Sequence, residues 1–460
     1  MSIKKTLLGL YSKVPFEIRH SLTCYNKVYG FYDKAQWWSK DEIERWQFER
    51  LKSIISYAYY NTDGYRQLYD EAGVTPDCLL KLDDIKKFPF TDKALLRDNV
   101  KAFTASSSVA GHLCLGMTGG STGIPFSFYY DLKHADAEYA FIENGWASIG
   151  WKPKDIGVVL RGTYLGDENN IIQKRNPYLY AMSSRYLTND NYETYMSSIE
   201  GSGATFLHVY PSTIADLSNL IIEHQDEGRL KIKQIFLGSE NFYPWQKELV
   251  KKAFPEAKLL SWYGHTERAI WAPWCEKEEK YHLNPFYGFT EILNGEEDVE
   301  EGQVGELVGT SFWVYGTPFI RYRTNDFAEK GSSICEKCGR NFQLINHIDG
   351  RLAEVIVGKT GRRISLTVFA GSIMHGKAFE HIKQFRFVQE ERGVVKLLIV
   401  TNSQFSNEDK IHIENSVISF LGDDFTSSVE IVDSLQKSKN GKFSYLEQHL
   451  EIERADRLEF

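Results

Sequence analysis

The sequence predicts an α/β protein with a helical N-terminal region, mostly parallel strands in its core and a smaller α/β C-terminal domain. Three observations predict this class. Apolar residues recur at helical spacing in residues 1–105, short β-rich runs alternate with longer helical windows in residues 106–350, and a second strand-and-helix pattern follows from residue 351. The last 110 residues are enough for a separate domain. We therefore expect domains at 1–350 and 351–460.

The N-terminal region shows a helix signature. Ser39 followed by Glu42 is a capping box. The apolar residues behind it recur at helical spacing, which predicts a helix packed on the core: Ile43, Trp46, Leu51, Ile54, Ile55 and Ala58. The first 16 residues lack a small-residue cleavage site, so they predict no signal peptide. They suit a short helix packed on the protein, the favoured reading, or one that touches a membrane surface.

The middle of the chain alternates strand-like and helix-like segments. The expected strands are Gly157–Leu160, Phe206–Tyr210, Ile235–Leu237 and Leu259–Trp262, and the expected helices include Ser212–His224 and Trp245–Phe254. Such alternation favours mostly parallel strands with helical crossovers. Ligands of such sheets bind beyond the carboxyl ends of the strands. The segments Gly238–Glu240 and Tyr263–Glu267 each follow a predicted strand, so they fall where a site is expected.

The C-terminal unit begins after Gly350-Arg351. Its expected strands are Val355–Val357, Phe385–Val388, Val394–Val400 and Val429–Val432, and its expected helices are Leu366–His375 and Glu408–Leu421.

Composition excludes several classes of function. The formal net charge of −8 argues against non-specific nucleic-acid binding. No run reaches the roughly 18 apolar residues of a membrane span. Six cysteines in 460 residues do not suggest a secreted disulfide framework. We expect a cytoplasmic protein that acts on small molecules, with its oligomeric state left open and a homodimer as one option.

The run Leu115–Phe126 is the most informative segment. Its glycines free the backbone N–H groups to surround phosphate oxygens, together with the hydroxyls of Ser121 and Thr122. The Lys-Ser/Thr pair of a Walker loop is absent. Alone, the segment would equally suit a flexible surface loop.

Four further motifs follow in order: Tyr263–Glu267, Arg321–Asp326, Gly350-Arg351 and Gly441-Lys442. With the glycine-rich loop, the set resembles the adenylate-forming superfamily of acyl-CoA synthetases, luciferase-type enzymes and peptide-synthetase adenylation domains. The run Gln36–Ser39 and the segment Ile320–Arg323 are similar to the phenylacetate–CoA ligase branch, especially its capsular polysaccharide biosynthesis (CapK-type) members. The resemblance covers nearly the whole chain.

The resemblance implies an ATP-dependent ligase with a mobile C-terminal domain. A carboxylate would attack the α-phosphate of ATP, giving an acyl-adenylate and pyrophosphate, and an acceptor would then displace AMP. The cofactors implied are ATP and Mg²⁺. The acceptor stays open between CoA and an amine or hydroxyl of a sugar or lipid-linked intermediate. A different class, a non-catalytic zinc-stabilised nucleotide-binding protein, is the alternative.

The resemblance also assigns residues to the nucleotide. The β- and γ-phosphates would contact the loop residues Thr118, Gly119, Gly120, Ser121, Thr122 and Gly123. Tyr263 and Gly264 would lie against adenine, with Ser239 and Glu240 bordering the adenine and acyl pockets. The ribose would be bound by Asp326 and Arg351.

Three residues would take part in the chemistry. Thr266 would bind the α-phosphate, Glu267 would carry Mg²⁺, and Lys442 would supply positive charge as the adenylate forms. Arg321 and Arg323 flank the ribose aspartate, and either would equally suit a structural ion pair.

One position departs from the family pattern. Members usually carry Asp or Lys two places after the junction arginine, where it acts as a hinge. Here that position holds Ala353, followed by Glu354. The hinge residue therefore stays open.

The pair Cys335-x-x-Cys338 is half of a zinc site. Cys275 and His282 would complete a closed Cys₃His set, which is typical of structural zinc. Reduced thiols in a turn are the simpler alternative.

Overall fold

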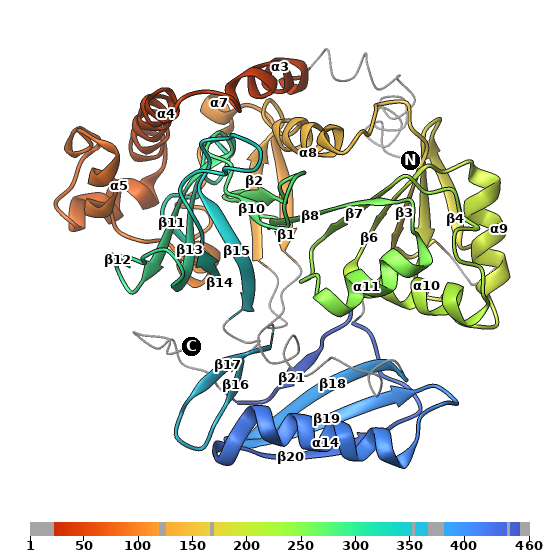
Figure 1. Cartoon of the computed structure of the whole chain (residues 1–460). Helices are drawn as coiled ribbons and strands as arrows, with labels where there is room; N and C mark the ends of the chain where they lie inside the picture. The colour runs from red at the N-terminus through yellow and green to blue at the C-terminus, as the bar shows by residue number, and fades with distance from the viewer. Residues whose placement is uncertain are drawn as a thin grey trace. The chain divides into compact units, whose positions relative to one another are not determined.

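The computed structural model describes residues 23–118, 126–165, 170–351, 355–366, 381–438 and 442–450 (Figure 1). The chain forms two compact units, each made of two stretches of sequence. The first unit contains Met1–Trp151 and Trp262–His347, and the second contains Lys152–Ser261 and Ile348–Phe460. The domain boundary at residue 350 therefore stays a prediction from the sequence.

Helices make up most of the N-terminal region of the first unit. They are α3 (Tyr25–Ala35), α4 (Lys40–Asn61), α5 (Asp63–Glu71), α6 (Lys93–Asp98), α7 (Ser107–Ala110) and α8 (Ala137–Ser148), with 3-10 turns at Pro76–Cys78 and Leu82–Lys87. The predicted capping box begins α4, because Ser39 Oγ accepts from the Glu42 N–H and Glu42 Oε2 accepts from the Ser39 N–H. Helix α4 buries Ile43, Leu51, Ile54, Ile55 and Ala58, as their spacing predicts.

The first unit also contains two antiparallel sheets. One is the pair β1 (Leu113–Thr118) and β2 (Phe126–Asp131). The other has the order β10-β15-β14-β13-β11-β12. Its strands are β10 (Tyr281–His282), β11 (Gly288–Asn294), β12 (Glu297–Asp298), β13 (Val304–Ser311), β14 (Tyr322–Lys330) and β15 (Leu344–Arg351).

The expectation of mostly parallel strands therefore fails over residues 281–351. The connections from β11 to β12, from β12 to β13 and from β13 to β14 are each shorter than the dozen or more residues that a parallel crossover needs. Antiparallel pairing is what short connections permit.

The second unit contains the parallel sheet that the sequence predicts. Its strands are β3 (Gly157–Arg161), β4 (Ile172–Asn176), β5 (Leu179–Ser183), β6 (Phe206–Val209), β7 (Gln234–Gly238) and β8 (Lys258–Gly264), in the order β4-β5-β3-β6-β7-β8. The pairs β5-β3, β3-β6 and β6-β7 are parallel. The last residues of β8 belong to the first unit, where they pair with β9 (Trp271–Pro273).

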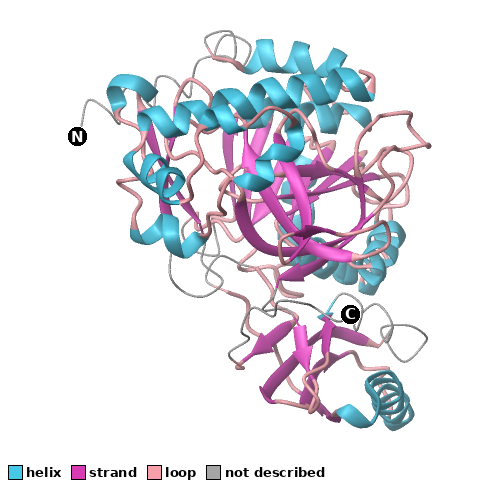
Figure 2. Cartoon of the chain, turned by 90° about the vertical axis from the view of Figure 1, so that its left-hand side faces the viewer, coloured by secondary structure: helices cyan, strands magenta, loops and turns pink. Residues whose placement is uncertain are grey.

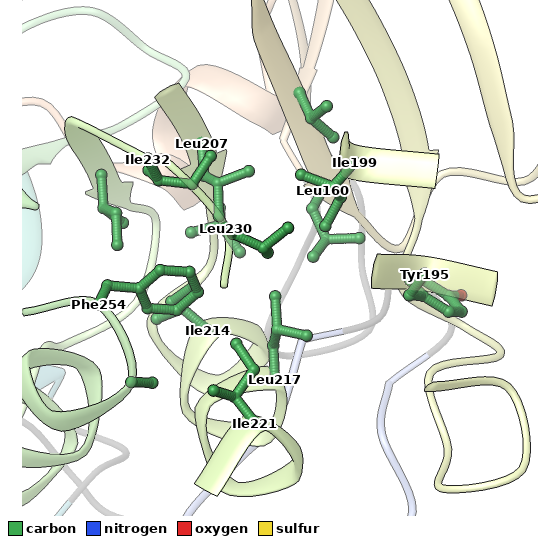
Figure 3. Close-up of a cluster of buried hydrophobic side chains, with 14 of the residues drawn as sticks. Leu160, Tyr195, Ile199, Leu207, Ile214, Leu217, Ile221, Leu230, Ile232 and Phe254 are labelled. Atoms are coloured by element: carbon green, nitrogen blue, oxygen red, sulfur yellow. The ribbon is translucent and has the colours of Figure 1, made fainter. Parts of the chain in front are cut away.

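Three helices connect these strands: α9 (Tyr192–Ser202), α10 (Pro211–Glu223) and α11 (Pro244–Ala253). Their apolar faces meet strand residues in one core, where Leu160 and Leu207 lie near Ile199, Ile214 and Leu217 (Figure 3). This core fixes the positions of the strand ends that carry the candidate site.

The C-terminal part of the second unit is a small α/β fold. It contains the pair β16 (Val355–Val357) and β17 (Arg363–Ser365), and a sheet of β18 (Ile382–Glu391), β19 (Val394–Thr401), β20 (Thr426–Ile431) and β21 (Leu446–Gln448). Helix α14 (Asn407–Leu421) covers one face of this sheet, and its Ile413, Val417 and Leu421 are buried there (Figure 2). Apart from Leu366, the predicted helix Leu366–His375 lies outside the described residues.

Among the described residues, no helix combines the length and apolarity needed to cross a bilayer.

Candidate active site

The predicted site residues divide between the two units. The first unit holds Thr118, Tyr263, Gly264, Thr266, Glu267 and Asp326, and the second holds Ser239, Glu240 and Lys442. Gly119, Gly120, Ser121, Thr122 and Gly123 lie outside the described residues, as do the side chain of Arg351 and the residues Ala353, Glu354 and Gly441.

The two ends of the glycine-rich loop are fixed by strand pairing. Thr118 ends β1 and Phe126 begins β2, and the two are antiparallel partners. Thr118 is buried, and its hydroxyl accepts from the Phe126 N–H at 3.3 Å. The hydroxyl that the sequence assigns to phosphate binding is therefore anchored at the entrance to the loop.

Tyr263 and Asp326 meet directly. The Tyr263 hydroxyl, at the end of β8, donates to Asp326 Oδ2 at 2.7 Å. Asp326 lies on β14 and is buried, and its own N–H donates to Thr324 Oγ1. This hydrogen bond brings together two motifs that are 63 residues apart in the sequence. The carboxylate of Asp326 offers only acceptor oxygens, which suits the hydroxyl donors of a ribose.

Glu267 is a buried carboxylate with two hydrogen-bonding neighbours. His265 Nδ1 lies 3.2 Å from Oε2, and the Tyr322 hydroxyl donates to Oε1 at 3.1 Å. Burial alone would raise the pKa of Glu267, but the hydrogen bonds and charge supplied by His265 and Tyr322 lower it overall. The side chain is thus held ionised, in the form that binds a hard cation.

Arg268, which sequence reasoning missed, fixes the turn that carries Glu267. Its Nε lies 2.9 Å from Glu138 Oε2 on α8, its Nη1 donates to the Ala135 carbonyl, and its guanidinium stacks over the Tyr130 ring. All three partners precede it by more than 100 residues, so no local signal in the sequence could have identified this anchor.

Strained backbone gathers at these motifs. Among the described residues, the non-glycine residues with positive φ are Gln225, Ser239, Arg268, Arg321 and Asn325. Four of them lie within or directly beside the segments assigned to the nucleotide. Left-handed backbone costs energy for such residues and often marks functional turns.

Arg321 and Arg323 are structural. Arg321 is buried and donates to both oxygens of Glu291, at 2.8 and 3.0 Å. Arg323 lies 3.1 Å from Glu306. Both guanidinium groups lie over the Phe90 ring. The sequence left open whether these arginines serve the nucleotide site or form structural ion pairs, and the structure shows the ion pairs.

Lys442 lies at the carboxyl end of β7 in the second unit. Its Nζ donates to the Ser239 carbonyl at 3.1 Å and lies 5.5 Å from the centroid of the Tyr210 ring. The segments 239–240 and 442, which the sequence assigns separately, therefore meet at the strand end where a ligand is expected.

Glu240 connects that strand end to its neighbours. Its Oε2 accepts from the Ser212 N–H near the start of α10 at 2.9 Å, and its Oε1 accepts from the Phe443 N–H at 3.3 Å. Burial raises the pKa of Glu240, while the hydrogen bonds from Ser212 and the charge of Lys442 oppose this. A carboxylate at a helix N-terminus is favoured by the helix dipole, so Glu240 has a structural role whatever it binds.

The four predicted zinc ligands form one buried cluster in the first unit. The ligand atoms of Cys275, His282, Cys335 and Cys338 all lie within 4.8 Å of one another. Cys275 Sγ and Cys335 Sγ are 3.7 Å apart, and Cys338 Sγ and His282 Nε2 are 3.5 Å apart. A tetrahedral zinc with bonds of about 2.3 Å to sulfur and about 2.0 Å to nitrogen needs edges of roughly 3.8 and 3.6 Å. The donor set fits zinc.

Cationic and aromatic side chains surround this cluster. Arg340 donates to Gln36 Oε1 and to both oxygens of Glu276, and its guanidinium lies 4.5 Å from the centroid of the Trp37 ring. Hydrogen bonds with Cys275 and His282 lower the pKa of Cys338, which favours a thiolate ligand. The cluster thus ties the N-terminal run Gln36–Ser39 to the loop before β15.

Comparisons with known proteins identify similar chains. A family model described as the CapK C-terminal domain matches residues 356–449. The phenylacetate-coenzyme A ligase of Pseudomonas putida is 26% identical over 339 residues, covering 69% of this chain and 73% of the relative. Protein CapK of Staphylococcus aureus is 20% identical over 404 residues, covering 86% of this chain and 87% of the relative.

A solved structure shows the same fold over most of the chain. 2-Hydroxyisobutyryl-CoA ligase, in its postadenylation state with R3-HIB-AMP, matches with a TM-score of 0.71 and 18% identity, covering 90% of this chain and 91% of that one.

Proposed function

We propose that this chain is a phenylacetate–CoA ligase-like protein of CapK type in the adenylate-forming superfamily, which activates a carboxylate with ATP and passes the acyl group to an acceptor. The observation that carries the proposal is Glu267, a buried carboxylate in the turn after β8, where His265 and Tyr322 contact its two oxygens and lower its pKa.

The first half-reaction joins a carboxylate oxygen to the α-phosphorus and releases pyrophosphate. Reactions of this kind depend on positioning and charge stabilisation more than on covalent work by the protein. We assign the ribose to Asp326, adenine to Tyr263 and Gly264, and the α-phosphate to the exposed hydroxyl of Thr266. Lys442 supplies positive charge to the phosphates, and Arg351 contacts the ribose.

Glu267 would hold Mg²⁺, which neutralises phosphate charge when bound. The phosphate loop of Gly119, Gly120, Ser121, Thr122 and Gly123 would continue from the anchored hydroxyl of Thr118. Ser239 and Glu240 border the adenine and acyl pockets. Zinc at the Cys₃His cluster would be structural, because four protein ligands leave no open position.

The second half-reaction needs an acceptor. Phenylacetate-coenzyme A ligase transfers to CoA, as its name states, which makes CoA the first candidate here. The CapK-type C-terminal domain favours a second candidate, an amine or hydroxyl of a sugar or lipid-linked intermediate in capsule synthesis. A non-catalytic zinc-stabilised nucleotide-binding protein remains the alternative from another class.

A hydroxylamine-trapping screen tests the activity. Purified protein is incubated with ATP, Mg²⁺ and aromatic acids, amino acids or uronic acids, and hydroxamate and pyrophosphate are measured. Acids that give a signal are then tested for transfer to CoA, amines and sugars. ATP binding without pyrophosphate formation for any acid would favour the non-catalytic alternative.

A further inference from the structure

Helix α10 carries a polar stripe that faces the C-terminal part of the second unit. Ser212, Asp216, Asn219 and Glu223 recur at intervals of three or four residues, so they lie on one side of the helix. The other side buries Ile214, Leu217 and Ile221 in the core of the parallel sheet (Figure 3). Nothing in that core requires the stripe to be charged.

The stripe is bound by strand β18 and by the segment before Lys442. Asp216 Oδ1 accepts from Gln384 Nε2 at 3.2 Å, and Asp216 Oδ2 forms an ion pair with Lys437 Nζ. Two turns further along α10, Glu223 Oε1 lies 2.8 Å from Lys383 Nζ. The side chains of Asp216 and Lys437 are only 19% and 22% exposed, so solvent screens this pair less than a surface pair.

Lys437 belongs to the same short segment as Lys442. The Ser438 N–H donates to the Lys442 carbonyl at 2.8 Å, and the Lys442 N–H donates to Ser438 Oγ at 3.1 Å. These reciprocal bonds tie the two ends of the segment together. On the far side of Lys442, the Phe443 N–H is bound by Glu240. The lysine is therefore flanked by two acidic anchors, Asp216 and Glu240.

Arg386 braces this segment from within the C-terminal sheet. Its side chain donates to the carbonyls of Gln436 and Ser444, one on each side of the lysine, and lies over the Phe443 ring. Arg386 belongs to strand β18 of the C-terminal sheet, whereas Asp216 belongs to α10, the helix that follows β6. The Asp216–Lys437 pair is thus a point where the segment is fixed relative to the end of β7.

We propose that Asp216 is a positioning residue for Lys442: its ion pair with Lys437 holds residues 436–438, to which Lys442 is hydrogen-bonded, so that the lysine reaches the carboxyl end of β7 during adenylate formation. This rests on the proposed function. The transfer step, in which Lys442 has no assigned role, should not need the pair.

The test compares two half-reactions in Asp216→Ala, with the paired exchange Asp216→Lys plus Lys437→Asp as a rescue. Adenylation is followed by pyrophosphate exchange with an acid from the screen. Transfer is followed from chemically prepared acyl-adenylate and the matching acceptor. Asp216→Ala should slow adenylation about 10-fold, leave the KM for ATP and the transfer rate unchanged, and regain most of its rate in the paired exchange. Lys410→Ala, which removes an exposed pair with Glu414 on α14, is the matched control.

Hydrogen exchange supplies a readout that does not depend on activity. In Asp216→Ala, amides of residues 436–438, 442 and 443 should exchange faster, together with those of residues 211–223 and 382–388, while those of β3 and β6 keep their protection. Unchanged exchange there, unchanged adenylation, or equal losses in both half-reactions would each overturn the positioning role. If no acid supports pyrophosphate exchange in the wild type, the proposed function fails, and the exchange experiment still decides whether Asp216 holds the segment.

Discussion

Glu267 is held as a carboxylate by two neighbours, His265 and Tyr322, of which only the first lies in its own motif. The motif sequence indicates the acid but not what keeps it charged. Tyr322 comes from a strand 55 residues further along the chain. Residue roles that depend on such partners need the folded structure, whereas residues that repeat a family motif can be assigned from sequence.

Substitution of Lys442 gives the most direct test of a single residue's role in adenylate formation. Lys442→Ala should slow adenylate formation by roughly 10²-fold or more, the scale for losing one group that stabilises developing charge. ATP affinity should change little, since the lysine acts mainly on the transition state. Rates come from pyrophosphate exchange and affinity from equilibrium binding.

Lys396→Ala is a suitable control for this prediction, because that lysine forms an exposed pair with Glu430 on the C-terminal sheet. Near-normal exchange in Lys442→Ala would remove the catalytic assignment.

At the scale of elements, segments with a clear period were predicted well. Strands β3, β6, β7 and β8, and helices α10, α11 and α14, lie where the pattern placed them, to within three residues. The antiparallel sheet of residues 281–351 was not foreseen, because strand runs show their period but not the direction of their neighbours. The ends of the chain and the loop at 119–125 lie outside the described residues.

The contact between α3 and α8 contains a buried acid outside the site. Glu143 accepts a hydrogen bond from the Tyr25 hydroxyl, and burial raises the pKa of Glu143 to about 7. The folded state therefore binds this proton more tightly than the unfolded chain. The proton bound to Glu143 stabilises the folded state fully at pH values below the ordinary carboxyl pKa, and this stabilisation is lost as the pH rises through about 7.

Glu143→Gln should remove this pH dependence. At pH near 8, the variant should be more stable than the wild type by on the order of 2–3 kcal/mol, and the difference should shrink toward pH near 5. Denaturant unfolding at a series of pH values measures it. Glu49→Gln, on the exposed side of α4, should leave the profile unchanged. Parallel profiles for Glu143→Gln and wild type would contradict the prediction.

The Cys₃His cluster gives a second prediction for an element. Purified protein should contain about one Zn²⁺ per chain, and Cys335→Ser should lower both metal content and melting temperature, because metal binding contributes to folding. Metal content is measured by elemental analysis and stability by thermal unfolding.

Cys78→Ser is the matched control for the cluster, since Cys78 lies near Thr75 in a separate turn. Metal-free protein whose melting is unaffected by a chelator would show that the four side chains are simply reduced thiols and an imidazole.

At the scale of the whole molecule, the similarity to Protein CapK of Staphylococcus aureus and to 2-hydroxyisobutyryl-CoA ligase covers most of the chain although identity is low. The shared fold is consistent with a motif order that could be recognised from the sequence, whereas the sequence did not identify the substrate. Aromatic residues, which make up 14% of the chain, illustrate this. Trp146 and Trp151 pack on each other in the first unit, while Phe206 packs on Phe236 in the second. An aromatic residue count alone does not define a pocket.

The junction after Arg351 carries the last prediction. Two half-reactions that use different faces of a C-terminal domain require a few junction residues to absorb a rotation. Ala353 stands where family members carry a charged hinge residue, and Glu354 follows it. Ala353→Pro or Glu354→Pro should fix one arrangement, because proline restricts its own φ and the residue before it. One half-reaction, either pyrophosphate exchange or acyl transfer, should persist while the other is lost.

Ala353→Gly is the control for this uncoupling, because it frees the backbone and should retain both half-reactions. Measuring exchange and transfer separately distinguishes a trapped arrangement from a general loss of folding, which thermal unfolding also reports. Equal losses of both half-reactions in a folded proline variant would place the hinge elsewhere. In that case the acyl-adenylate would have to meet its acceptor without rotation at this junction, and the pair Asp216–Lys437 would act as a fixed contact that persists through both steps.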